Sequence, residues 1–154
     1  MTMLDRNTVI EELITGLKGA AAGTYPYLAA VTDAAIQYCI RDPTNLKLIK
    51  YNKEIWLGPI DDDVPYATVG KYSHRFTIGL LVVYVGEHQG ITEFKTVVDI
   101  AQDVEKYIFS NPTLSSSGAV LREGIKMDFS YAFSGRGTVH FAYIEIPYDH
   151  LSSI

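Results

Sequence analysis

Apolar and polar residues alternate most regularly in the C-terminal part of the chain. Ile125, Met127, Phe129, Tyr131 and Phe133 fall on one face, and polar or small residues separate them. A period of two sustained over nine residues is the period of a β-strand and not of a helix. This segment therefore predicts a strand.

A second strand is predicted immediately after the first. The intervening segment 134–137 reads Ser-Gly-Arg-Gly, and its glycines can adopt the positive φ values that a tight hairpin needs. From Val139 to Tyr148 the chain is apolar at both alternating sets of positions except at His140 and Glu145. A strand that is apolar on both faces predicts a place inside a sheet, covered on both sides.

Apolar residues at helical spacing predict two helices. Between Phe94 and Ile108 they form one stripe, with charged or polar residues on the rest of the surface, and Pro112 prevents the helix from continuing past Asn111. A shorter stripe from Val9 to Leu17 predicts an N-terminal helix. The Thr and Glu at positions 8 and 11 have the spacing of a capping box at its start.

The middle of the chain predicts less regular elements. A second helix is expected over 28–40, and segments 46–51 and 54–57 predict a small hairpin or one bent strand. Two prolines and three consecutive acids predict a loop over 58–65, and a long strand follows over 73–85. This order indicates an α+β fold with a mixed, largely antiparallel β-sheet and helices packed on one face. No linker interrupts residues 1–154, so we expect a single domain.

Composition narrows the classes of function. The chain has 154 residues and a formal charge of −5, which argues against a surface that neutralises many phosphates. The N-terminus lacks the pattern of a signal peptide, and no apolar run approaches the roughly 20 residues that span a bilayer. We therefore expect a soluble protein that is not secreted. The single cysteine, Cys39, lies among apolar residues and is interpreted as a small buried hydrophobe.

No motif for catalysis or for a cofactor is present in the sequence. Asp61, Asp62 and Asp63 are adjacent, and a metal ion needs ligands from several directions, so a solvated loop is the preferred interpretation. His74 and His140 lack the spacing of zinc ligands and are predicted on strands, at the sheet surface or at an interface. A triad assembled in space stays open. An enzyme of this kind would need a pocket near these two histidines and Asp128.

Tyrosine and phenylalanine are abundant, with eleven and six copies respectively. These numbers exceed what a small core must hold, and both residue types are common at protein interfaces. The alternative is that the rings cover the sheet and leave their hydroxyl groups in water. The tyrosines considered for an interface are Tyr66, Tyr72, Tyr84, Tyr131, Tyr143 and Tyr148.

Four segments together carry a resemblance to a known family. They are Trp56-Leu57-Gly58-Pro59, the strand Arg75 to Val85, the helix Phe94 to Phe109 followed by Asn-Pro-Thr-Leu, and the closing strand Val139 to Asp149. In this order they resemble the tail-terminator proteins of bacteriophages, also called minor tail or tail-completion proteins. Segment 20–45 is longer than expected for that family and is a candidate contact surface of its own.

The resemblance implies a structural virion protein with no catalytic residues and no cofactor. Such proteins form a ring, expected to be a hexamer, at the head-proximal end of the tail, where they stop tail-tube polymerisation and provide the joint to the head connector. The implied partners are further copies of the chain, the tail-tube protein and the head connector or neck protein. No membrane is involved, and DNA only passes through the lumen. The implied location is the virion, after assembly in the host cytoplasm.

Two sets of residues are predicted to serve this ring. The interface set is Tyr66, Tyr72, His74, Arg75, Tyr131, His140, Tyr143 and Tyr148. The lumen-facing set, chosen because carboxylates repel phosphates, is Asp61, Asp62, Asp63 and Glu87. Two other functions stay open: a head-closure or neck adaptor, and a small α+β enzyme or ligand-binding domain.

Overall fold

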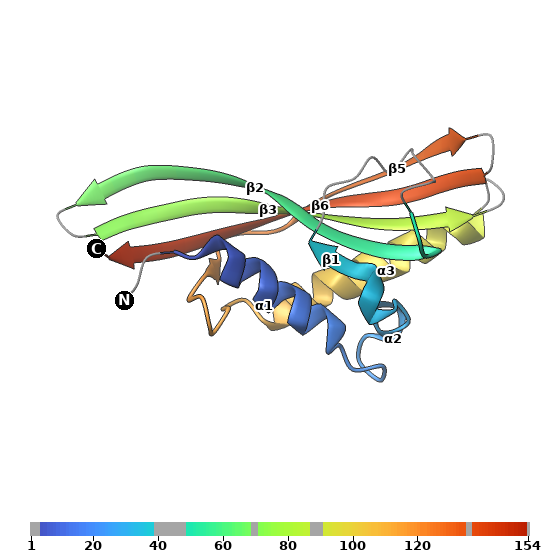
Figure 1. Ribbon diagram of the computed structural model, residues 1–154, viewed down its shortest axis with the longest axis horizontal. Coiled ribbons are helices and arrows are strands. Elements are labelled where there is room, and N and C mark those ends of the chain that lie inside the picture. The colour runs from blue at the N-terminus through green and yellow to red at the C-terminus, as the bar shows by residue number, and fades with distance from the viewer. Residues whose placement is uncertain (1–3, 39–48, 69–70, 87–90, 135–136, 154) are drawn as a thin grey trace.

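One six-stranded β-sheet carries the described helices on one of its faces (Figure 1). The computed structural model describes residues 4–38, 49–68, 71–86, 91–134 and 137–153. The helices are α1 (Arg6–Lys18), α2 (Pro26–Ala29), the 3-10 turn η1 (Asp33–Ala35) and α3 (Ile91–Ser110). The strands are β1 (Ile36–Tyr38), β2 (Lys53–Thr68), β3 (Lys71–Gly86), β4 (Val120–Leu121), β5 (Lys126–Ser134) and β6 (Gly137–Ser153). The predicted α+β class, with a mixed and mostly antiparallel sheet, is confirmed.

Three long strands form the frame of the sheet. The order is β1-β2-β3-β6, after which β5 and β4 pair with successive parts of the outer side of β6. The pairing of β1 with β2 is parallel, and all other pairings are antiparallel. At one end β2, β3 and β6 project beyond the helices (Figure 1). The prediction that the closing strand lies inside the sheet is confirmed, because β6 has strands on both sides, but the described helices cover only one of its two faces.

The main core lies between the helices and one face of the sheet. Helix α1 buries Val9, Leu13 and Leu17, and α3 buries a stripe that includes Val97 and Val104, so both predicted amphipathic helices are confirmed. The sheet residues buried in this core are Ile55, Leu57, Phe76, Ile78, Leu80, Val82, Ala142, Ile144, Ile146 and Tyr148. A smaller apolar cluster lies on the opposite face around Trp56, Val83 and Val139.

The start of α1 differs from the predicted capping box. The carboxylate of Asp5 accepts hydrogen bonds from the backbone N–H groups of Asn7 and Thr8, so Asp5 is the N-cap and Thr8 lies inside the helix. The bonds with Thr8 and Asn7 lower the pKa of Asp5 below its ordinary value. An ionised aspartate at the positive end of the helix is a stronger acceptor than a threonine hydroxyl.

The predicted second helix over 28–40 is wrong. Helix α2 ends at Ala29, and the chain becomes a strand at Ile36 because residues 36–38 pair with 55–57 of β2. The carboxylate of Asp103 accepts hydrogen bonds from the backbone N–H groups of Tyr27 and Leu28, which satisfies the start of this short helix. Cys39, and the interpretation of it as a buried hydrophobe, lie outside the described residues.

The predicted loop over 58–65 is also wrong, because this segment belongs to β2. The register with β3 is interrupted between Leu57 and Ile60 and again between Asp63 and Tyr66, and one proline falls in each interruption. Among the described residues, no strand lies on the outer side of this part of β2. Pro59 and Pro65 are accommodated there because bulges and edges do not need every backbone donor.

Candidate assembly surfaces

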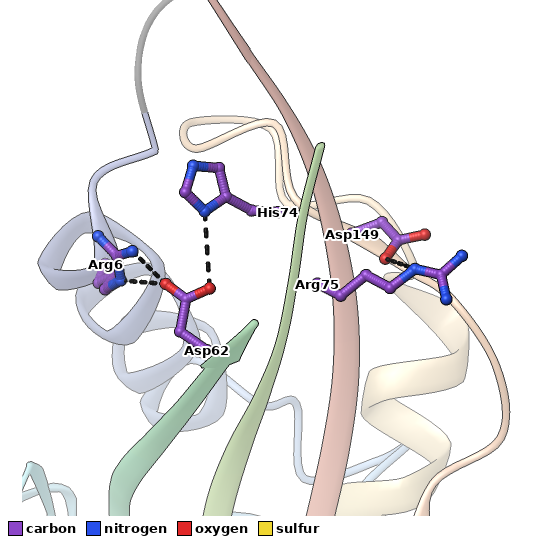
Figure 2. A network of polar contacts seen from close by, with 5 residues as sticks. All are labelled: Arg6, Asp62, His74, Arg75 and Asp149. Carbon is purple, nitrogen blue, oxygen red and sulfur yellow. Dashed lines mark hydrogen bonds and ion pairs between the residues drawn. The ribbon is translucent and has the colours of Figure 1, made fainter. Parts of the chain in front are cut away.

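A polar network joins the start of α1 to the projecting end of the sheet. The Arg6 guanidinium donates to the Asp62 carboxylate in β2, and His74 Nδ1 in β3 lies 3.6 Å from Asp62 Oδ1 (Figure 2). His74 is buried and Asp62 is half-buried, so the contact is only partly screened by water. The sequence predicted His74 at an interface or at the sheet surface, and the structure places it under the N-terminus of α1.

On the opposite face of the same strands lies a second, more exposed group of charges. Arg75 Nε is 3.9 Å from Asp149 Oδ1, and Arg122 Nε is 3.7 Å from the same oxygen. Figure 2 shows Arg75 and His74 pointing to opposite sides of the sheet, as successive residues of a strand do. Of these two predicted interface residues, only Arg75 has an exposed side chain.

His150 extends the buried polar region. It is the cross-strand partner of His74, and its Nε2 lies 2.9 Å from the carbonyl oxygen of Ser117, to which it donates. Burial lowers the pKa of His150, the bond to Ser117 partly offsets this effect, and the neighbouring His74 lowers the pKa further. The Ser117 loop is held in turn by the Glu12 carboxylate, which accepts from the backbone N–H groups of Ser116 and Ser117.

His140 lies near the other end of the sheet, far along the strands from His74. It pairs with Tyr84 of β3 and with Tyr131 of β5, and its ring centroid is 6.2 Å from that of Tyr131. Burial lowers the pKa of His140, while the carboxylate of Glu93 acts in the opposite direction. The His140 ring is buried in the described chain. The sequence predicted this residue at the sheet surface or at an interface, and the structure does not place it at the surface.

Tyr148, one of the predicted interface residues, is not exposed in the described chain. Its side chain is fully buried in the main core, and its ring stacks on Phe76 with centroids 5.8 Å apart. Burial raises the pKa of Tyr148 strongly. The residue faces the helices because β6 alternates, and the even-numbered positions of β6 point into the core.

The other predicted interface tyrosines differ in position. Tyr143 is half-buried on the face without helices, and a Cβ placed on Gly79 would lie 2.8 Å from its hydroxyl oxygen, so its ring packs over a glycine. Burial raises the pKa of Tyr143. Tyr131 on β5 is exposed. Tyr66 and Tyr72 lie in β2 and β3, and their side chains are outside the description.

The predicted lumen residues do not share one surface. Asp61 is exposed and pairs with Thr77, whereas Asp62 pairs with Phe76 and points toward α1, where it binds Arg6. Adjacent strand residues face opposite sides, so a single lumen wall contains one of these two carboxylates and not both. The side chain of Asp63 and all of Glu87 lie outside the described residues.

Sequence reasoning missed a group of exposed aromatic residues at the edges of the sheet. Phe94 of α3 and Phe129 of β5 form an edge-to-face pair with ring centroids 6.0 Å apart, and both rings are partly exposed. Tyr38 of β1, at the opposite edge of the sheet, and Tyr27 of α2 are also exposed. The alternation of β5 was visible in the sequence, but its position as an outer strand with a thinly covered face was not.

Among the described residues, the three that the enzyme hypothesis names do not lie together. His74, His140 and Asp128 pair with different residues at separate levels of the sheet. One groove of about 450 Å³ lies between α1 and the loop after α3, and another of about 490 Å³ lies beside His150; both are lined mainly by serine, threonine and other small or polar residues. No group of three metal-ligating residues occurs in the part of the chain that the structure describes.

Comparison with known proteins gives a structural neighbour and no sequence relative. No protein-family model matches the chain, and no curated protein matches it in sequence. A chain from the virion of a native gene transfer agent (GTA) particle has a similar structure, with a TM-score of 0.50 and 13% sequence identity. The match covers 92% of this chain and 95% of that chain, so the two share a fold over nearly their whole lengths. None of the described helices is long and apolar enough to cross a membrane.

Proposed function

We propose that this protein is a structural component of a phage-type virion. The observation that carries the proposal is the fold, which a chain of a gene transfer agent virion shares over 92% of the present sequence. The separation of His74, His140 and Asp128 on the sheet is in keeping with a role in assembly rather than in catalysis.

Within the virion, we propose the role of tail terminator. The protein forms a ring at the head-proximal end of the tail, stops polymerisation of the tail tube and supplies the joint to the head connector. Support comes from the four sequence segments that resemble tail terminators and from their placement here in β2, β3, α3 and β6. Exposed aromatic residues at both sides of the sheet, including Tyr38 and Phe129, suit a protein that contacts copies of itself.

A head-closure or neck adaptor is the second candidate, because the same fold evidence accommodates any component of the head–tail joint. The two roles differ in their partners. A terminator binds the tail-tube protein and limits tube growth, whereas an adaptor binds the portal or connector and leaves tube growth unchanged.

The test is size-exclusion chromatography with light scattering, followed by negative-stain images, on the protein alone and after mixing with its tail-tube neighbour. We expect a ring with a mass about six times the 17.1 kDa of the chain, and tubes that stop growing when the ring is added. Binding to the connector with no effect on tube length would replace the terminator by the adaptor. A protein that stays monomeric with both partners would overturn both roles.

A further inference from the structure

The register of the sheet places β1 and β5 at the same level on opposite edges. Ile36 of β1 pairs with Ile55, which pairs with Val82 of β3, which pairs with Ala142 of β6. Ala142 pairs in turn with Phe129 of β5. One straight row across the sheet therefore begins at β1 and ends at β5.

The two edge strands also run in opposite directions. β1 is parallel to β2, and the three pairings that lead from β2 through β3 and β6 to β5 are all antiparallel. When a second copy lies beside the first in the same orientation, its β1 is thus antiparallel to the β5 of the first copy. Antiparallel pairing is the more common arrangement of neighbouring strands.

Both edges carry exposed aromatic side chains. We define the β5 patch as Phe94, Phe129 and Tyr131, which are 40%, 39% and 49% exposed, and the β1 patch as Tyr38, which is 54% exposed. Large rings that stay accessible on two sides of one sheet are typical of surfaces that become buried in an assembly.

The charges that can protect an edge strand, on Lys126 and Asp128, lie in the first part of β5, and its second part lacks such features. Its register with β6 is continuous from Lys126 to Ser134, without a bulge, and residues 129–134 contain neither a charge nor a proline. No strand within the described ranges lies beyond it. The outer side of β5 is therefore suited to receive a neighbouring chain.

We propose that the β5 patch of one subunit packs against the β1 patch of a second copy of this chain. This inference rests on the proposed ring and identifies its contact. The contact joins two different surfaces, and such contacts repeat from copy to copy until they close into a ring or continue as a filament. Because β1 and β5 lie at the same level, one copy can follow the next without a shift along the strands.

The first test compares three single substitutions in the full-length protein by light scattering over a range of concentrations. Phe129→Ser and Tyr38→Ser each remove one exposed ring from one patch. Phe109→Ser is the matched control, since Phe109 is equally exposed but lies at the end of α3, outside both patches. We expect the first two to weaken self-association about 30-fold or more, as loss of an interface hot spot does, and the control to assemble like the native chain.

Mixing the two weakened variants tests whether the contact joins different surfaces. Each variant keeps one intact patch, so an equal mixture should form a two-chain species through the intact β1 patch of the Phe129 variant and the intact β5 patch of the Tyr38 variant. If β5 instead paired with β5 of another copy, Tyr38→Ser would assemble normally and the inference would be overturned. Far-UV circular dichroism and thermal melts confirm that each variant remains folded.

The outcomes separate this inference from the proposed function. A native ring that survives both Phe129→Ser and Tyr38→Ser overturns the contact and leaves the ring intact. A native protein that never assembles, alone or with the tail-tube protein, overturns the ring and the contact together. Loss of assembly in both variants, with a two-chain species in the mixture, supports the contact.

Discussion

The middle and the projecting end of the sheet are stabilised in different ways. In the middle, α1 and α3 cover one face, and the buried residues are almost entirely apolar, such as Leu13, Val104 and Ile144. At the projecting end, where β3 and β6 pass the start of α1, the buried residues include two histidines, His74 and His150, with the half-buried Asp62 beside His74. Apolar packing therefore stabilises the middle of the sheet. The stability of the projecting end depends instead on charges and hydrogen bonds, and therefore on pH.

The largest effect is expected in the packed middle. Tyr148→Ala should lower the free energy of unfolding by about 3–5 kcal/mol, because it empties a large site that lies between Phe76 and the helices. Chemical denaturation measures this change. Tyr148→Phe is the matched control and should be nearly neutral, since the hydroxyl oxygen has no hydrogen-bond partner among the described residues. Equal losses in both variants would show that the hydroxyl group, and not the ring, matters.

At the projecting end a smaller loss is expected. Asp62→Ala removes the acceptor of Arg6 and the carboxylate beside His74, and should cost about 1–3 kcal/mol in the same denaturation experiment. A double-mutant cycle with Arg6→Ala isolates the contribution of that pair. Additive losses from the two substitutions would mean that the ion pair contributes nothing to stability.

The pH dependence of the free energy of unfolding should come from the buried histidines. Burial lowers the pKa of both His140 and His150 from the ordinary value of 6.5, so the unfolded chain binds protons more readily than the folded one. The histidines therefore make their full contribution to the free energy of unfolding above about pH 6.5. This contribution decreases as the pH falls toward the lower pKa values of the folded protein. His150→Gln keeps a donor for the carbonyl of Ser117 and should flatten the thermal melting temperature between pH 7 and pH 5. If the melting temperature of this variant falls with pH as steeply as that of the native chain, other groups cause the pH dependence.

The smallest effect is expected on the exposed face of the same end. Arg75→Ala removes a guanidinium that lies 3.9 Å from Asp149 and is more than half exposed, and should change the free energy of unfolding by less than about 0.5 kcal/mol. A loss comparable to that of Asp62→Ala would show that this charge is coupled more strongly than its exposure suggests.

Sequence patterns predicted the elements whose own residues determine their form. The apolar stripes of α1 and α3 and the alternation of β5 appear in the structure as expected. The prediction failed at β1 and at residues 58–65 of β2, where pairing with a neighbouring strand outweighs local preference. The bulges that accommodate Pro59 and Pro65 cannot be recognised from the neighbouring sequence. The same is true of the parallel pairing of residues 36–38.

The candidate surfaces were harder to predict than the fold, because exposure depends on what lies opposite each strand. Alternation alone put Phe129, Tyr131 and Met127 on one face, yet the first two are exposed and Met127 is partly buried against the core. It did not reveal that Tyr148 faces the helices while Tyr143 faces away from them. Both differences follow from the order of strands, which requires contacts between distant parts of the chain.

The two interruptions in β2 have a consequence for the behaviour of the protein at high concentration. Pro59 and Pro65 deny an incoming strand two backbone donors, and the bulges around them bend the edge away from the flat form that strand addition requires. This side of the molecule is therefore a poor template for the strand addition by which fibrils grow, which favours dispersed molecules at high concentration.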